Sequence, residues 1–143
     1  VFLAVENLNP RITYLMQRPE DLLLTFAQVP GVYFCLDFGH LWLSSIAHKF
    51  DFFSAVKALL HTGRVLTTHL HNNKSVVGEV ESISDSHLGL ENGNISYAGV
   101  FGAGISFGPG GYLQVNRFIL ESEELPGESF KALQTYIGTC LGR

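Results

Sequence analysis

The chain has 143 residues, 46% of them hydrophobic and 15% charged, and carries a formal net charge of -4 with histidine neutral. This length suits a single domain, residues 1–143, with one core, and the composition excludes a disordered chain. The negative charge and the lack of a basic cluster argue against a nucleic-acid partner without excluding one, because a bound metal would add local positive charge.

No apolar stretch approaches the roughly 18 residues that are needed to span a bilayer. No signal peptide is recognisable either, so we expect a cytoplasmic protein with no membrane partner. The two cysteines, Cys35 and Cys140, fit neither a disulfide framework nor a paired-cysteine zinc site, and Cys35 is expected to be buried in its apolar run. The chain begins at Val1, directly in an apolar run, so we expect a fragment, a processed product or a truncated chain.

Apolar segments typical of buried strands alternate with segments of helical periodicity. In chain order, strands are predicted at 2–5, 32–36, 64–71 and 117–120, the first of them apolar on both faces and fully buried. Helices are predicted from 18 to the turn at 30–31, at 51–61, over 95–107 and at 128–139. A loop is predicted between His40 and Asp51, and the polar segment 72–94 as a long loop that is functional or mobile. The side chains expected to be buried in the first helix are Leu22, Leu23, Phe26 and Ala27.

Strands that alternate with helices predict an α/β fold with a parallel sheet. Four such units are half of a closed TIM barrel of the (β/α)8 type, and an open four-stranded sheet is the alternative. No strand is followed by a glycine-rich loop that would cradle a phosphate, so a nucleotide-binding doubly wound fold has little support.

Every predicted strand ends in a side chain that is able to bind a metal. In parallel α/β folds ligands bind at the carboxyl ends of the strands, so these groups are expected to converge. Carboxylates and imidazoles together suit a divalent cation such as zinc, manganese, iron or magnesium. The strand-end residues are Glu6, Asp37 with His40, His69 or His71, and Glu121.

Several of these residues also have a plainer interpretation. Asp37 is equally suited to capping the next turn with His40 packed in the core, and Gly39 between them would let the backbone turn sharply. His69 and His71 point to one face of their strand, and the alternative is a pair of neutral histidines at the edge of the core. A second pair, Asp85 and His87, taken alone fits a solvated loop.

Five short motifs follow one another along the chain: Val5-Glu6-Asn7, Leu36-Asp37-Phe38-Gly39-His40, His69-Leu70-His71-Asn72, Asp85-Ser86-His87 and Ile119-Leu120-Glu121. In this order they resemble the xylose isomerase-like TIM barrel superfamily, which includes sugar phosphate isomerases and epimerases and endonuclease IV. Residues 18–23 also resemble the family's helix after strand five. The resemblance runs over nearly the whole chain and implies strands five to eight, the C-terminal half of the barrel.

The resemblance implies a set of metal ligands and a cofactor. Its core ligands correspond to Glu6, Asp37, His69 and Glu121, and the additional ligands of the multi-zinc members to His40, Asp85 and His87. In the sugar epimerases the residues that correspond to Glu6 and Glu121 also move the proton. The implied cofactor is a divalent metal, with zinc or manganese ahead of magnesium, iron or cobalt. We predict substrate contacts at His71, His40 and Trp42, the last in the loop expected after His40.

The chain also departs from the family pattern. Asn72 stands where relatives often carry Asp, and Glu91-Asn92-Gly93 stands where they often carry Gly-Glu-Gly. Strands one to four have no counterpart, so another chain or a second copy, as a homodimer, is expected to supply the missing half.

Three functions follow as hypotheses. The first is a metal-dependent isomerase or epimerase of a small sugar or sugar phosphate, with Glu6 and Glu121 as its acid and base. The second is a zinc-dependent phosphodiester hydrolase resembling endonuclease IV, which His40 and the Asp85 and His87 pair favour. The third is an inactive half-barrel that acts as a scaffold.

Overall fold

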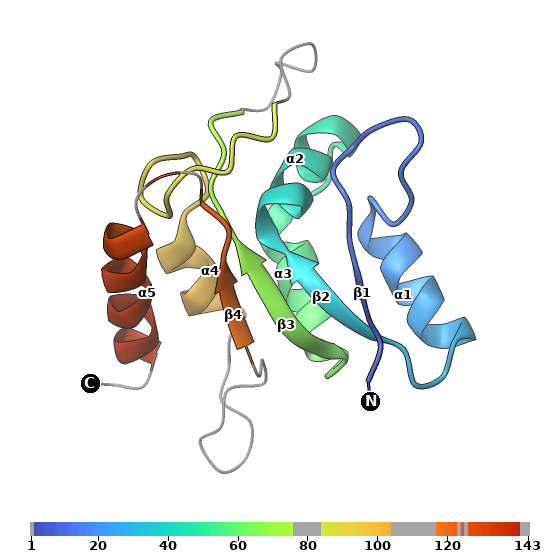
Figure 1. The fold of residues 1–143 in the computed structure, drawn as a ribbon. Helices are drawn as coiled ribbons and strands as arrows, with labels where there is room; N and C mark the ends of the chain where they lie inside the picture. The colour runs from blue at the N-terminus through green and yellow to red at the C-terminus, as the bar shows by residue number, and fades with distance from the viewer. Residues whose placement is uncertain (1, 76–83, 104–116, 123, 125, 141–143) are drawn as a thin grey trace.

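The computed structural model describes residues 2–75, 84–103, 117–122, 124 and 126–140 (Figure 1). Strands and helices alternate as the sequence predicts, with one additional helix after the second strand. In chain order the elements are β1 (Ala4–Glu6), α1 (Pro19–Gln28), β2 (Tyr33–Asp37), α2 (Phe38–His48), α3 (Phe52–His61), β3 (Val65–Leu70), α4 (Tyr97–Ala103), β4 (Arg117–Leu120) and α5 (Pro126–Cys140).

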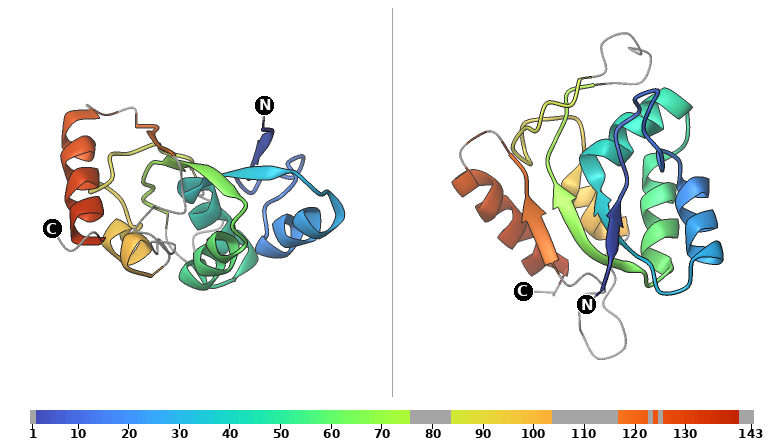
Figure 2. Two further views of the ribbon diagram at one scale, coloured as in Figure 1. Left: turned by 90° about the horizontal axis from the view of Figure 1, so that it is seen from below. Right: turned by 45° about the vertical axis from the view of Figure 1, so that its right-hand side comes forward.

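The four strands form one parallel sheet in the order β1-β2-β3-β4, so neighbours in sequence are neighbours in the sheet. Helices α1, α3 and α4 lie along one side of this sheet (Figure 2), and α1 packs on α3, α3 on α4, and α4 on α5. A parallel sheet whose strand order never reverses is the arrangement of a β/α barrel, not of a doubly wound fold. The predicted α/β fold is confirmed as a partial barrel.

The hydrophobic core fills the space between the sheet and its helices. Phe34 and Leu36 of β2 point into it, and Val56 and Leu59 of α3 meet them from the helical side, each at most 1% exposed. Burying an aliphatic or aromatic side chain of this size contributes roughly 1.5–3 kcal/mol. The central strands are therefore held firmly, and their carboxyl ends are fixed in position.

The loop predicted between His40 and Asp51 is wrong, because residues 38–48 form helix α2. Asp37 initiates this helix as its N-cap: its carboxylate accepts a hydrogen bond from the backbone N–H of His40 at 2.7 Å. Leu41 and Ile46 are then buried on the inner side of the helix. Residues 38–48 contain neither Pro nor Asn, and this composition was the available signal for a helix in place of the predicted loop.

The first strand is less buried than predicted. Phe2 is 72% and Leu3 69% exposed, and the strand itself begins only at Ala4. Among the described strands β1 has a single neighbour, β2, and the side chains of Phe2 and Leu3 next to it are open to solvent.

Two helices also differ from their predictions. Of the four side chains expected to be buried in α1, Leu22 and Phe26 are, whereas Leu23 and Ala27 are exposed. Helix α4 covers Tyr97–Ala103, so the helix predicted over 95–107 begins two residues later than expected, and its part beyond residue 103 lies outside the described residues. No helix in the described part of the chain combines the length and the apolar character needed to cross a membrane.

Candidate metal centre

The carboxyl ends of the four strands bring together one side chain each. Glu6 is the last residue of β1, Asp37 the last of β2, and His69 lies one residue before the end of β3. The parallel register places Asp37 beside His69, and the backbone N–H of Glu121 donates to the carbonyl of Leu70 at 3.0 Å just after β4. We call Glu6, Asp37, His69 and Glu121 the strand-end cluster.

Three carboxylates surround one imidazole nitrogen in this cluster. His69 Nδ1 lies 3.0 Å from Glu121 Oε1, 3.4 Å from Glu6 Oε1 and 3.8 Å from Asp37 Oδ2. Contacts with His40 and His69 lower the pKa of Glu6 to about 2, although its burial acts in the opposite direction. Contacts with the Cys35 thiol and then with Glu6 raise the pKa of His69 to about 10. The cluster therefore concentrates negative charge that a cation would compensate.

Two buried atoms of the strand-end cluster are left without a hydrogen bond. Within the described part of the chain, neither Asp37 Oδ2 nor His69 Nδ1 has a hydrogen-bond partner, and the Asp37 side chain is fully buried. A buried polar atom without a partner costs about 1–3 kcal/mol, so such atoms call for a ligand. Carboxylate oxygens and an imidazole nitrogen are the donor set that zinc, manganese or iron accepts, and these residues fit a divalent cation.

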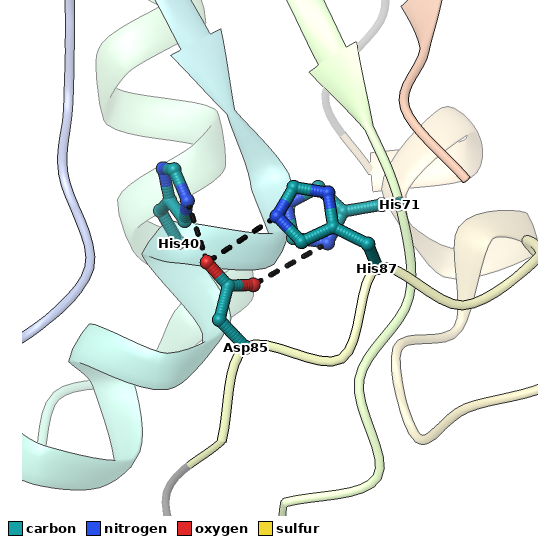
Figure 3. Close-up of side chains that lie close together, drawn as sticks. All are labelled: His40, His71, Asp85 and His87. Atoms are coloured by element: carbon teal, nitrogen blue, oxygen red, sulfur yellow. Dashed lines mark hydrogen bonds and ion pairs between the residues drawn. The ribbon is translucent and has the colours of Figure 1, made fainter. Parts of the chain in front are cut away.

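A second group of four side chains lies next to the first (Figure 3). Asp85 stands between three imidazoles: its Oδ2 lies 2.9 Å from His40 Nε2 and 3.4 Å from His87 Nε2, and its Oδ1 lies 3.8 Å from His71 Nδ1. The rings of His71 and His87 stack with centroids 3.9 Å apart. We call His40, His71, Asp85 and His87 the loop-side cluster, and its nitrogen and oxygen atoms also form a donor set for a metal.

The charges of the loop-side cluster depend on each other. Burial disfavours a charge on His40, but the contacts with Asp85 and Glu6 outweigh it and raise its pKa to about 11. Burial likewise opposes the charge on Asp85, while the hydrogen bond with His40 holds the pKa of Asp85 well below its usual range. Asp85 Oδ1 is another buried atom that makes no hydrogen bond within the described residues.

His40 is held in a ligand-like orientation from one side. Its Nδ1 lies 3.1 Å from the carbonyl oxygen of Asn7, the partner to which a neutral ring would donate its proton. In that tautomer Nε2 carries the lone pair and faces Asp85 at 2.9 Å. The contact between Nε2 and the Asp85 carboxylate is favourable when the ring is protonated or when a cation lies between the two groups. A backbone carbonyl that orients the ring through its other nitrogen is common in metal-binding histidines.

Asparagine side chains position the loop that carries Asp85 and His87. Asn72 and Leu88 form an isolated antiparallel bridge, and the side-chain oxygen of Asn73 accepts a hydrogen bond from Ser86 N at 2.6 Å. Asn9 donates to Asp85 Oδ2 at 3.0 Å. His87 takes a positive φ of 43°, which turns its side chain at the cost of backbone strain. The segment is anchored by specific polar contacts, so the interpretation of Asp85 and His87 as a solvated pair is wrong.

Asp37 connects the two clusters. Its Oδ1 accepts the backbone N–H of His40 and lies 3.0 Å from His71 Nε2, while Oδ2 faces His69. Gly39 makes this packing sterically allowed: a Cβ atom at this position would lie 2.0 Å from the His71 ring. The role predicted for Gly39, a sharp backbone turn, is wrong, because the residue is helical and its function is close approach.

The structure therefore places all seven predicted metal ligands in two adjacent clusters, together with His71. Trp42 lies elsewhere: it belongs to α2, not to a loop, its indole N–H donates to the carbonyl of Ser75 at 3.0 Å, and its ring packs edge-on against Phe52. Glu91, in the segment that departs from Gly-Glu-Gly, is exposed and contacts Tyr136 of α5.

Sequence reasoning missed three residues of the site. Asn7 and Asn9 follow Glu6 and bind the backbone of Asp37 and the side chain of Asp85. The available signals were the place of Asn7 in the motif Val5-Glu6-Asn7 and the asparagine two residues later. Cys35 was expected to act as a small buried hydrophobe; it is buried, but its thiol lies beside Glu6 and His69. Its position two residues before Asp37 in a strand was the available signal.

Comparisons with known proteins give matches at the level of structure. No protein-family model matches the sequence, and no curated protein does. A D-tagatose 3-epimerase-like protein superposes with a TM-score of 0.72 at 19% identity, over 98% of this chain and 48% of the other. Endonuclease IV from Thermus thermophilus superposes with a TM-score of 0.64 at 25% identity, over 96% of this chain and 49% of the other. An L-ribulose 3-epimerase superposes with a TM-score of 0.60 at 20% identity, over 99% of this chain and 48% of the other.

The chain thus spans about half the length of the solved structures that it matches. These neighbours are of the kinds that the sequence motifs resemble, sugar epimerases and endonuclease IV, and the match extends over nearly all of this chain. The resemblance to the xylose isomerase-like TIM barrel superfamily is confirmed as a shared fold, at half the size of the barrel.

Proposed function

We propose that this chain, which has the fold of half a xylose isomerase-like barrel, carries the metal-binding and proton-transfer residues of an isomerase or epimerase acting on a small sugar or sugar phosphate. The observation that carries the proposal is the strand-end cluster, in which three carboxylates surround His69 Nδ1 and two buried atoms lack a hydrogen bond within the described residues. Two of the three solved structures named above are sugar epimerases or epimerase-like by their titles.

Glu6, Asp37, His69 and Glu121 would hold the cation, for which zinc and manganese are the first choices and magnesium, iron and cobalt the alternatives. A divalent metal bound there supplies Lewis acidity toward a carbonyl or hydroxyl oxygen of the sugar. The protein residues keep the site oriented, because Asp37 is fully buried and is fixed by the start of α2.

Glu6 and Glu121 are suited to the proton transfer. They approach His69 from opposite edges of the sheet, β1 and β4, and both side chains are about one-third exposed, so a substrate can reach them. One carboxylate removes the proton from the carbon next to the carbonyl, and the electron pair of that C–H bond passes into an enediolate. The other, as the carboxylic acid, returns a proton to the opposite face of the carbon, which inverts it.

A second candidate function is phosphodiester hydrolysis, and the loop-side cluster is the observation that favours it. His40, His71, Asp85 and His87 offer a second donor set next to the first, with Asp37 in contact with both. Two adjacent cations are typical of enzymes that activate water against a phosphate ester. The net charge of -4 makes a small phosphodiester a better substrate than a long nucleic acid.

We also propose that the working form contains a second half-barrel, from an N-terminal half of a longer polypeptide, from another chain or from a second copy as a homodimer. Apolar side chains are exposed at both ends of the sheet, Phe2 and Leu3 at β1 and Ile119 at β4. Two half-barrels would pair β4 of each with β1 of the other in parallel and bury these open edges.

Elemental analysis tests the metal site. The chain is loaded with zinc or manganese, freed of excess ion and analysed beside Glu6→Gln and His69→Gln, with the exposed Glu20→Gln and His61→Gln as matched controls. We expect at least one equivalent of metal in the parent and controls and a loss in both cluster variants. A folded chain that takes up neither ion would overturn both enzymatic proposals and leave the scaffold hypothesis.

Two assays then separate the candidate reactions. Exchange of the sugar C–H proton in heavy water, followed by NMR with ketoses and their phosphates, reports epimerisation. Release of nitrophenolate from bis(4-nitrophenyl) phosphate reports hydrolysis. Exchange that Glu6→Gln and Glu121→Gln abolish supports the epimerase. Hydrolysis that His87→Gln abolishes, together with a fall from two metal equivalents to one, supports the hydrolase instead.

A further inference from the structure

Cys35 does not face the hydrophobic core. It lies in the middle of β2, and its neighbours Phe34 and Leu36 belong to the core cluster between the sheet and its helices, which does not include Cys35 among the described residues. Successive side chains of a strand point to opposite faces, so Cys35 projects to the same face as Asp37, two residues later. The register also pairs Cys35 directly with Glu6 of β1.

The surroundings of the Cys35 thiol are polar. Its Sγ, a carboxylate oxygen of Glu6 and a ring nitrogen of His69 all lie within 4.8 Å of one another. The contact with Cys35 is also the strongest interaction that favours a proton on His69. Only 6% of Cys35 is exposed, so the thiol is screened from solvent while it faces two members of the strand-end cluster.

An independent observation marks this position as a ligand site. The Asp37 side chain, on the same face of β2, is fully buried, and its Oδ2 has no hydrogen-bond partner within the described residues although it faces His69. An apolar role for Cys35 explains its burial but not its place beside an imidazole and a carboxylate that approach the same volume.

We propose that Cys35 is a sulfur ligand of the metal in the strand-end cluster, and that the site therefore selects a thiophilic cation such as Zn²⁺ or Co²⁺ over Mg²⁺ or Mn²⁺. This inference rests on the proposed metal site and deepens it. On binding, the S–H bond breaks, a metal–sulfur bond forms and the proton leaves to solvent, with no change of oxidation state. Thiolate ligands favour zinc and cobalt, whereas sites made only of oxygen suit magnesium and manganese.

Cobalt is the probe that separates ligation from mere proximity. The chain is titrated with Co²⁺ under reducing, oxygen-free conditions, and its absorption spectrum is recorded. A cobalt–thiolate bond produces an intense sulfur-to-metal charge-transfer band in the near ultraviolet, while ligand-field bands in the visible report any bound cobalt. We expect both kinds of band in the parent chain and in Cys140→Ser, which keeps Cys35 and changes only the half-buried cysteine of α5.

Two variants remove the sulfur. Cys35→Ser keeps a small polar side chain and Cys35→Ala a small apolar one, and circular dichroism confirms that each is folded. We expect both to lose the charge-transfer band, to bind Co²⁺ at least about tenfold more weakly, and to lose the preference for Zn²⁺ over Mn²⁺ in competition.

The outcomes distinguish this inference from the metal site itself. Visible bands without a charge-transfer band in the parent chain would overturn the role of Cys35 and leave the strand-end site in place. A charge-transfer band that persists in Cys35→Ser and Cys35→Ala would overturn it as well. No cobalt spectrum at all would overturn the metal site and this inference together.

Discussion

The two clusters lie side by side but owe their geometry to different parts of the fold. The strand-end cluster is placed by backbone: parallel ladder bonds align β1 to β4, and the side chains follow from the register. The loop-side cluster is placed by side chains: Asn9 and Asn73 hold the segment that carries Asp85 and His87. Backbone ladders survive most substitutions, whereas each asparagine contact depends on one residue.

Asp37 is the exception, because it belongs to both arrangements. It ends β2, caps α2, contacts His71 with one oxygen and faces His69 with the other. The comparison therefore predicts that changes outside Asp37 and outside the contact between His40 and Glu6 affect the clusters separately, and that a change of Asp37 affects them together.

Asp37→Ala is expected to have the largest effect. It removes the cap of α2 and leaves the fully buried imidazole of His71 without its partner on Nε2, so we expect the free energy of unfolding to fall by about 2–4 kcal/mol. Both metal sites should be lost with it. Urea unfolding followed by circular dichroism gives the first quantity, and elemental analysis gives the second.

Asp51→Ala is the matched control, because Asp51 caps α3 in the same way, accepting from Ser54 N at 2.8 Å, but is exposed and belongs to neither cluster. Asp51→Ala should lower the free energy of unfolding by about 1 kcal/mol and leave metal binding unchanged. Equal losses of stability in the two variants, or normal metal content in Asp37→Ala, would show that Asp37 acts only as a cap.

Gly39→Ala is expected to disturb the loop-side cluster alone. The new methyl group would lie 2.0 Å from the His71 ring, so the ring must move and with it the stack on His87. We expect the free energy of unfolding in urea to fall by about 1–3 kcal/mol. If the loop-side cluster binds the second proposed cation, the variant should lose that cation while the strand-end cluster keeps its own.

Gly102→Ala provides the control of opposite sign. This glycine of α4 has no atom within 4 Å of the added methyl group, so the substitution should stabilise the chain by up to about 1 kcal/mol through helix propensity. If Gly39→Ala behaves like Gly102→Ala, the close packing between α2 and His71 plays no part in the second site.

The same contrast explains what the sequence could predict. Strand ends can be predicted from the sequence, because an apolar run that stops at a polar residue marks both the strand and its end. These polar residues are Glu6, Asp37, His69 and Glu121. A parallel sheet then brings the ends together at one edge. The start of α2 is harder to predict because capping and metal binding look like alternatives for Asp37 in the sequence, whereas in the structure one carboxylate oxygen caps the helix and the other faces the strand-end cluster.

Only part of the loop-side cluster could be predicted from residues alone: His40 and His71 follow strand ends, and Asp85 and His87 stand out as a pair but fit a solvated loop. The bridge between Asn72 and Leu88 and the positive φ of His87 are tertiary features with no periodic signature, so only the family resemblance assigned that pair to the site. The exposure of the residues around β1 could not be predicted either, because an apolar sequence does not show whether its strand has one neighbour or two in the sheet.

The pH dependence of the metal-free chain should show the smallest effect on its acid side, since Glu6 is about one-third exposed and solvent screens its charge. The pKa of Glu6 is lowered from 4.5 to about 2, so its contribution to stability is present above pH 4.5 and is lost as the pH falls toward 2. The pKa of His40 is raised from 6.5 to about 11, so its contribution is present below pH 6.5 and is lost as the pH rises toward 11. Urea midpoints in the presence of a chelator should therefore be highest between pH 4.5 and 6.5. Glu6→Gln should flatten the acid side of this profile and His40→Gln the alkaline side. If one variant flattens both sides equally, the charges of the two clusters are coupled through His40 more tightly than their separate origins suggest.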